Sequence, residues 1–137
     1  MSHILRSYPF LIPMVVAMLS EIVKMTVEGM RTGAWHAGIF RSGGMPSSHS
    51  AFVTSLVIVV AKKSGLHSIE FAIAFVFACI IWYDATSSRR AIGEQAKVLN
   101  RLQHWQHLSE RLGHSLLEVL CGIIFGAIVT MVGIWLS

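Results

Sequence analysis

The chain has 137 residues, of which 54% are hydrophobic and only 13% are charged. This composition argues against a water-soluble domain and predicts a single integral membrane unit over residues 1–137. The net charge of +4 suits loops that face lipid headgroups or phosphate, and we expect no nucleic-acid partner. The two cysteines, Cys79 and Cys121, lie inside apolar runs without zinc or disulfide spacing and are expected to be packing residues.

The first predicted membrane span runs from Tyr8 to Val23. A short start carrying Arg6 precedes it, as in a signal peptide, but no convincing small-residue cleavage site follows, so we expect the helix to be retained. Four charged residues at spacings of three, four and three share one face if the helix continues: Glu21, Lys24, Glu28 and Arg31. One interpretation is a stripe of ion pairs that neutralises itself. The other is that Lys24 and Arg31 project two cations toward one anion.

The second span is predicted from about Ala51 to Ala61, with Ser47 as its earliest start, and the stretch SGGMPSSHS precedes it. Glycines followed by Ser47 or Ser48 as a cap can aim several backbone N–H groups at an anion. The same features also describe an ordinary helix cap. His49 favours the first interpretation, because an imidazole in the first helical turn can titrate and supply a proton.

The third span is predicted from Ile69 to Tyr83, and good helix formers from Asp84 to about Arg101 extend it beyond the membrane. Arg89 and Arg90 follow directly after the span. They are either anchors on the cytoplasmic side or an anion clamp, and Asp84 is placed to pair with one of them.

The fourth span, Leu116 to Leu136, comfortably reaches the roughly 20 residues that a bilayer crossing requires. His114 and Glu118 lie four residues apart at its start and therefore share a helix face. The carboxylate can accept the imidazole N–H and leave the other ring nitrogen free to attack. A buried hydrogen-bonded pair is the alternative, but an ionisable residue in an apolar run is costly, which favours a function.

Two further patterns carry less information. His104, His107 and His114 have spacings that can ligate zinc, but no carboxylate or cysteine completes the set nearby, and we expect no metal. Gly122 and Gly126 form a small-xxx-small pair, which serves either close packing within the chain or a homodimer face.

These segments predict an all-α polytopic transmembrane bundle with about four spans and a helical extramembrane excursion. Four spans place residues 24–48 and 84–113 on the same side of the membrane. That side carries eight cations: Lys24, Arg31, Arg41, Arg89, Arg90, Lys97, Arg101 and Arg111. Because the opposite side carries only Arg6, Lys62 and Lys63, we expect the larger loops of this multi-pass cell-membrane protein to be cytoplasmic.

Taken together, the polar segments resemble the type 2 phosphatidic acid phosphatase superfamily, which includes the vanadium haloperoxidases. Its signatures are Lys-x6-Arg-Pro, then Pro-Ser-Gly-His, then Ser-Arg followed after a gap by His-x3-Asp. The matches here are Lys24 with Arg31, PSSH at 46–49, SR at 88–89 and HSLLE at 114–118.

The sequence is most similar to the divergent, short branch of this superfamily. Three segments are typical of that branch: GGMPSSHSA, YDATSSRRAIGEQAKVLN and LGHSLLEVLCG. The resemblance covers nearly the whole chain. Departures from the superfamily pattern are Thr32 for proline, Ser48 for glycine, Glu118 for aspartate and a longer gap before His114.

The resemblance implies a metal-independent phosphatase without a cofactor. His114 would be the nucleophile that forms a phosphohistidine, Glu118 would orient it, and His49 would protonate the leaving oxygen and then activate water. The candidate phosphate-binding residues are Lys24, Arg31, Ser47, Ser48, Arg89 and Arg90, with Arg111 as an alternative arginine.

Since all four spans carry these residues at the same membrane face, the expected substrate is a lipid phosphate or prenyl diphosphate whose tail stays in the bilayer. A catalytically inactive protein that binds a phosphorylated lipid or an anion in the same pocket is the alternative. A small transporter or scaffold with self-neutralised charges is a third hypothesis.

Overall fold

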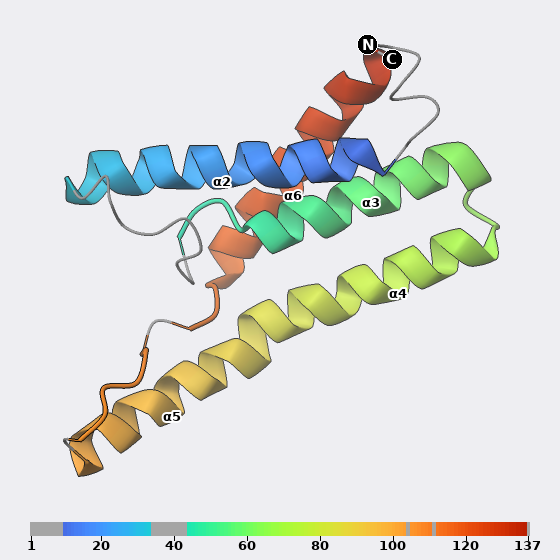
Figure 1. Cartoon of the computed structure of the whole chain (residues 1–137). Helices are drawn as coiled ribbons and strands as arrows, with labels where there is room; N and C mark the ends of the chain where they lie inside the picture. Colours follow the sequence, from blue (N-terminus) through green and yellow to red (C-terminus); the bar gives the residue numbers. More distant parts are fainter. Residues whose placement is uncertain (1–9, 34–43, 104, 111, 137) are drawn as a thin grey trace.

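The computed structural model describes residues 10–33, 44–103, 105–110 and 112–136 (Figure 1). Its α-helices are α2 (Leu11–Thr32), α3 (Ser48–Ser64), α4 (Ile69–Tyr83), α5 (Arg89–Leu102) and α6 (Leu116–Trp135). A π-helical turn, η1 (Asp84–Ser88), joins α4 to α5. These ranges contain no β-strand, and the all-α prediction is confirmed.

Helix α3 is the centre of the bundle, since it contacts α2, α4 and α6 (Figure 1). Its buried residues are no larger than valine or threonine: Ser48, Ser50, Ala51, Val53, Thr54, Ser55 and Val59. The hydroxyls are paired inside the bundle. Thr54 Oγ1 donates to the Ser50 carbonyl at 2.7 Å, and Thr130 Oγ1 donates to Ser55 Oγ at 2.7 Å. These bonds offset the cost of burying polar groups, and the small side chains let neighbouring helices approach closely.

Helix α6 packs on α3 through Gly122 and Gly126. A Cβ added to Gly122 would lie 2.5 Å from the Ser47 carbonyl oxygen, and a Cβ on Gly126 would collide with the backbone of Ala51. The small-xxx-small pair therefore serves packing within the chain. The homodimer remains a prediction.

Two helices in the described ranges are long and apolar enough to cross a membrane: the continuous helix Ile69–Leu102 and α6. Only 17% and 22% of their most apolar windows are buried, so most of these side chains face outward, as lipid-facing surfaces do. The other two helices differ, because α2 carries four charged residues and α3 has only 17 residues. A membrane crossing by α2 and α3 therefore remains a prediction.

The predicted boundaries agree closely for α4 and α6, which differ from the predicted spans only at Trp135 in place of Leu136. Helix α3 starts at Ser48, earlier than Ala51, because Ser47 caps its first turn and Ser48 and Ser50 are buried there.

Helix α2 continues past the predicted end at Val23 to Thr32, where Gly33 terminates it with a φ of 70°. Apolar content alone underestimated this helix, since its second half is helical but charged. Tyr8, Arg6 and Arg41 lie outside the described residues.

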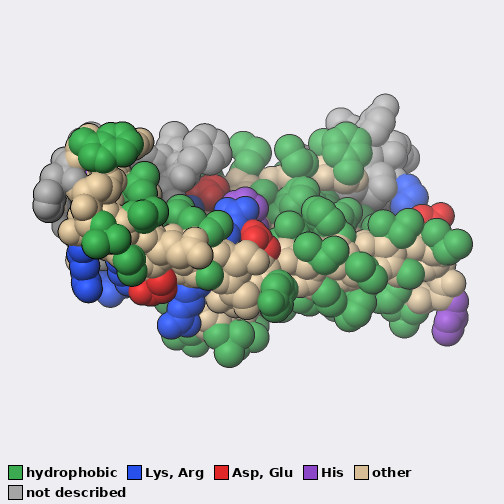
Figure 2. Space-filling model, turned by 90° about the horizontal axis from the view of Figure 1, so that it is seen from below, with side chains coloured by type: hydrophobic (Ala, Val, Ile, Leu, Met, Phe, Trp, Pro, Cys, Tyr) green, Lys and Arg blue, Asp and Glu red, His purple; other side chains and the backbone are tan. Residues whose placement is uncertain are grey.

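The helix α4–η1–α5 changes character along its length. Figure 2 looks onto it and shows hydrophobic side chains along α4, whereas charged side chains gather around the junction with α5 and along α5. The predicted helical excursion after Tyr83 is therefore confirmed, and η1 marks the transition from apolar to charged surface.

We expect Gly126→Ala to lower the free energy of unfolding by about 1–3 kcal/mol, because its methyl group overpacks the contact with Ala51. Gly133→Ala is the matched control on the same helix, since its Cβ would meet Ile12 Cγ2 at an ordinary 3.6 Å. Thermal unfolding of both variants in detergent, followed by circular dichroism, measures the difference. Equal melting temperatures would contradict the close-packing interpretation.

Candidate active site

Ser47 organises the start of α3 and ties it to α6. Its Oγ accepts the Ser50 N–H at 3.4 Å, and its own N–H donates to the Glu118 carbonyl at 3.2 Å. The predicted serine cap is therefore confirmed at Ser47, which is completely buried. This arrangement leaves His49, two residues later, exposed at the end of the bundle that carries α6's first turn.

Glu21 connects α2 to the same place. Ser48 Oγ donates to Glu21 Oε1 at 2.6 Å, and Lys24 Nζ lies 2.9 Å from Glu21 Oε2. Lys24 is only 9% exposed, and its stem packs against Gly44. A buried ammonium group requires such a carboxylate, so the ion-pair interpretation of the charged stripe holds for Lys24. Arg31 is exposed in the last turn of α2.

The π-helical turn η1 selects which arginine pairs with Asp84. The Arg89 N–H donates to the Asp84 carbonyl, five residues back, and Arg89 Nε lies 2.6 Å from Asp84 Oδ2. Such turns are rare and occur often at functional sites. The predicted pairing of Asp84 with an arginine is therefore confirmed for Arg89. Arg90 is exposed and does not line the pocket described below.

The same turn receives the chain that leads into α6. The His114 N–H donates to the Ala85 carbonyl at 2.9 Å. When a helix returns from five-residue to four-residue hydrogen bonding, one carbonyl is passed over. Here the Ala85 carbonyl accepts a bond from outside the helix. Gly113 makes this approach possible, because its φ is 87° and a Cβ would lie 2.7 Å from the Arg90 nitrogen.

His114 and Glu118 lie together as predicted, but the carboxylate serves mainly as a cap of α6. Glu118 Oε2 accepts the Ser115 N–H at 2.7 Å, and Ser115 Oγ accepts the Glu118 N–H at 3.3 Å. The distance from His114 Nδ1 to Glu118 Oε2 is 3.4 Å without hydrogen-bond geometry, and Nδ1 has no hydrogen-bond partner among the described residues. Glu118 therefore acts on His114 mainly through its charge.

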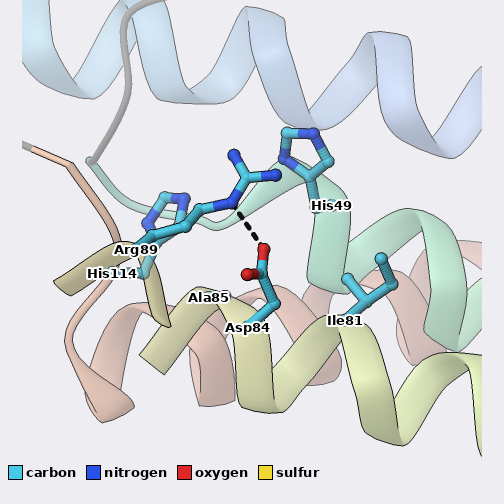
Figure 3. A pocket seen from close by; sticks show the side chains of 6 residues that line it. All are labelled: His49, Ile81, Asp84, Ala85, Arg89 and His114. Atoms are coloured by element: carbon cyan, nitrogen blue, oxygen red, sulfur yellow. Dashed lines mark hydrogen bonds and ion pairs between the residues drawn. The ribbon is translucent and has the colours of Figure 1, made fainter. Parts of the chain in front are cut away.

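A pocket brings His49 and His114 together from distant parts of the chain. Its other lining residues are Ile81, Asp84, Ala85 and Arg89. Figure 3 shows the Arg89 guanidinium directed toward His49, with its Nε paired to Asp84. The pocket thus presents two imidazoles and one guanidinium, which is a set suited to nucleophilic attack, proton transfer and the stabilisation of anionic oxygens.

His114 precedes α6 and is largely shielded, with its side chain 9% exposed. Burial lowers the pKa of His114 from its ordinary value of 6.5, the Glu118 carboxylate opposes this change, and the charge of Lys24 adds to it. The net effect favours the neutral imidazole, the form that has a free lone pair.

The sequence had not placed Ile81, Asp84 and Ala85 in the pocket, nor identified Glu21 as the partner of Ser48. No local pattern distinguishes a π-helical turn from a regular helix, so the contact of Asp84 with Arg89 had no periodic signal. The remaining candidates, Lys24, Arg31, Ser47 and Ser48, do not line the pocket.

The structure places no group of three or more potential metal ligands together in the parts of the chain it describes. His104 and Arg111 lie outside these parts, so the structure says nothing of the HxxH pair or of the third candidate arginine.

Comparison with known proteins identifies a family for this chain. A family model described as "Divergent PAP2 family" matches residues 5–129. The chain belongs to this family. It is similar to "Uncharacterized membrane protein YuiD" of Bacillus subtilis (strain 168), with 34% identity over 152 residues that cover 95% of this chain and 96% of the relative. No solved structure matches the chain.

Membership in the divergent PAP2 family confirms the resemblance inferred from the four motifs. Together with the membrane relative and the two outward-facing apolar helices, it identifies the chain as an all-helical membrane protein related to PAP2 proteins.

We expect Gly113→Ala to displace His114 from η1, because the new methyl group would collide with the backbone of Arg90. Gly33→Ala is the matched control: its φ is also positive, at 70°, but nothing lies within 4 Å of the added Cβ. Each substitution costs about 1–2 kcal/mol for the left-handed conformation, and only Gly113→Ala adds a collision.

Hydrogen exchange of the His114 amide and thermal unfolding in detergent measure the two effects. The Gly113 variant should lose protection at His114 and be less stable than the Gly33 variant by at least about 1 kcal/mol. Equal stability and unchanged protection would show that His114 does not depend on this contact.

We expect His114 to titrate below pH 6.5, because desolvation disfavours the imidazolium and a lower pH is needed to protonate it. Glu118→Gln should lower the midpoint further, since a carboxylate that stabilises the imidazolium is lost while an acceptor for the Ser115 N–H remains. Side-chain NMR of histidine-labelled protein, with His114→Gln for assignment, gives both midpoints. A midpoint above 6.5, or an upward shift in Glu118→Gln, would contradict this assignment.

Proposed function

We propose that this member of the divergent PAP2 family is an integral membrane, metal-independent phosphatase that hydrolyses a lipid phosphate or prenyl diphosphate through a phosphohistidine. The observation that supports this most is the pocket in which His49 and His114 lie with Arg89. Two imidazoles from distant segments are the minimum needed for a nucleophile and a separate proton donor.

In the proposed reaction, His114 is the nucleophile. Its Nδ1 faces the Glu118 carboxylate, so Nε2 attacks phosphorus, the P–N bond forms and the ester P–O bond breaks. His49 gives its proton to the leaving oxygen. It then takes a proton from water, whose oxygen attacks the phosphohistidine and releases phosphate and neutral His114.

Arg89 has the strongest support as the phosphate ligand, because its guanidinium lines the pocket. Asp84 holds it there through the bond to Nε, which leaves the two terminal nitrogens available for phosphate oxygens. Lys24 and Ser48 are bonded to Glu21 and would contribute directly only by exchanging that carboxylate for phosphate. Arg31, Ser47 and Arg90 have less support, since none of them lines the pocket.

The position of the pocket along the helices supports a lipid substrate. Residues 69–88 of α4 and η1 would extend about 30 Å, which is the thickness of the hydrocarbon core. Asp84 and Arg89 then lie at the membrane boundary, where a headgroup phosphate would meet them while its tail stays among lipids. The proposal includes a multi-pass protein of the cell membrane whose pocket faces the cytoplasm.

A second candidate function is the binding of a phosphorylated lipid or anion without hydrolysis. It is favoured by one observation: Glu118 is committed to capping Ser115 and makes no hydrogen bond to His114. A histidine that is not firmly oriented by its carboxylate is a poorer nucleophile.

Phosphate release from a panel of lipid phosphates and prenyl diphosphates, by purified protein in detergent, tests the proposal. We expect His114→Ala and His49→Ala each to lower the rate by at least about 100-fold, because each removes a group that acts in the transition state. His67→Ala is the matched control, since His67 is exposed on the turn between α3 and α4, at the other end of α3 from His49. This variant should retain the wild-type rate.

Phosphate release that survives both pocket substitutions would refute the catalytic roles. Saturable binding of a lipid phosphate, without release and weakened by Arg89→Ala, would establish the second candidate instead.

A further inference from the structure

The chain segment that delivers His114 to the pocket has no secondary structure of its own. Residues 105–110 and 112–115 form neither helix nor strand. A segment of this kind needs bonds from a rigid neighbour to hold a side chain in a defined place. Helix α5 supplies them.

Asn100, near the end of α5, binds this segment through three hydrogen bonds. Its Nδ2 donates to the Leu108 carbonyl at 2.9 Å and to Glu110 Oε1 at 2.8 Å, and its Oδ1 accepts the Leu108 N–H at 2.9 Å. The backbone of Leu108 fixes the orientation of the amide, because an N–H only donates and a carbonyl only accepts. Both ends of the side chain are therefore satisfied by the segment.

A second contact with α5, at Glu110, lies closer to His114 along the chain. Gly93 of α5 is so near the segment that an added Cβ would lie 2.7 Å from the Glu110 carbonyl oxygen. After this point the chain reaches Gly113 and the bond from the His114 N–H to Ala85. The segment is thus held along α5 and η1 at three places, which are Asn100, Gly93 and Ala85 in order toward the pocket.

We propose that Asn100 is a positioning residue for His114, which it holds in the pocket by fixing residues 108–110 on α5. Its consequence for catalysis rests on the proposed phosphatase function. The positioning role is independent of that function, because it concerns only where the imidazole lies in the pocket. Asn100 touches neither the pocket nor the reacting atoms, so it acts only through the segment.

The substitution Asn100→Asp is the sharpest test. It keeps the shape and an acceptor for the Leu108 N–H, but it loses both donated bonds and sets a carboxylate against Glu110. Adding Glu110→Gln supplies an amide that donates to the new carboxylate, so the double variant restores one bond with its direction reversed. Rescue of this kind would not follow from a general loss of stability.

Lys97→Gln is the matched control. It lies on the same helix, changes the net charge by the same single unit and breaks an exposed ion pair within α5, the 3.0 Å contact with Glu94. Size-exclusion chromatography and thermal unfolding in detergent show first that each variant is folded.

Three readouts are measured on purified protein: hydrogen exchange of the Leu108 and His114 amides, the rate at which diethyl pyrocarbonate modifies His114, and kcat and KM for phosphate release. We expect Asn100→Asp to speed exchange and modification at least tenfold. It should lower kcat by about 10- to 100-fold with little change in KM, since a misplaced nucleophile affects the reaction step. The double variant should recover severalfold in all three, and Lys97→Gln should match wild type.

Unchanged exchange and modification in Asn100→Asp would overturn the proposal, as would faster exchange with an unchanged kcat in an active enzyme. If the wild-type protein releases no phosphate, the proposed function fails. The positioning role is then decided by exchange and modification alone.

Discussion

The five-residue hydrogen bond from the Arg89 N–H to the Asp84 carbonyl is the constraint on which the site depends. It keeps a single helix running from an apolar surface to a charged one. It also places the Arg89 side chain against Asp84 and exposes the Ala85 carbonyl to the His114 N–H. A regular α-helix would rotate these groups apart, because successive residues turn by about 100° and a five-residue step does not return to the same face.

The imidazole of His49 is placed by backbone contacts between α3 and α6. The Ser47 N–H bonds to the Glu118 carbonyl, and Gly122 allows the Ser47 carbonyl to approach α6 closely. These contacts hold the start of α3 against the start of α6. Because His49 follows Ser47 by two residues and His114 precedes Glu118 by four, the two imidazoles are held near each other by the packing of main chain rather than by long flexible side chains.

Much of this architecture was predictable because it depends on local rules. Apolar runs predicted α4 and α6 almost to the residue, serines before a helix predicted a cap at Ser47 or Ser48, and a spacing of four predicted that His114 lies near Glu118. The same rules did not choose between Arg89 and Arg90, since that choice depends on the π-helical register.

Contacts between residues far apart in the sequence could not be predicted from local patterns either. The bond from Ser48 to Glu21 joins residues 27 positions apart, and it makes Ser48, a candidate phosphate ligand, a structural link between α2 and α3. Asn100 gave no signal either, because its partners lie in a segment without periodic pattern. Lys24 matched the family motif in spacing, but its surroundings decide whether it can reach a ligand.

The two ion pairs of the site differ in how readily they can be exchanged, and this difference separates their roles. Asp84 and Arg89 have side chains 36% and 45% exposed, and a pair this open to solvent contributes only about 0–1 kcal/mol. Glu21 and Lys24 are 22% and 11% exposed, so separating them would leave charges with little access to water. In the proposed function, an arriving phosphate therefore binds the terminal nitrogens of Arg89, and any weakening of the Asp84 bond costs little. Lys24 keeps its carboxylate and acts on the pocket through its charge.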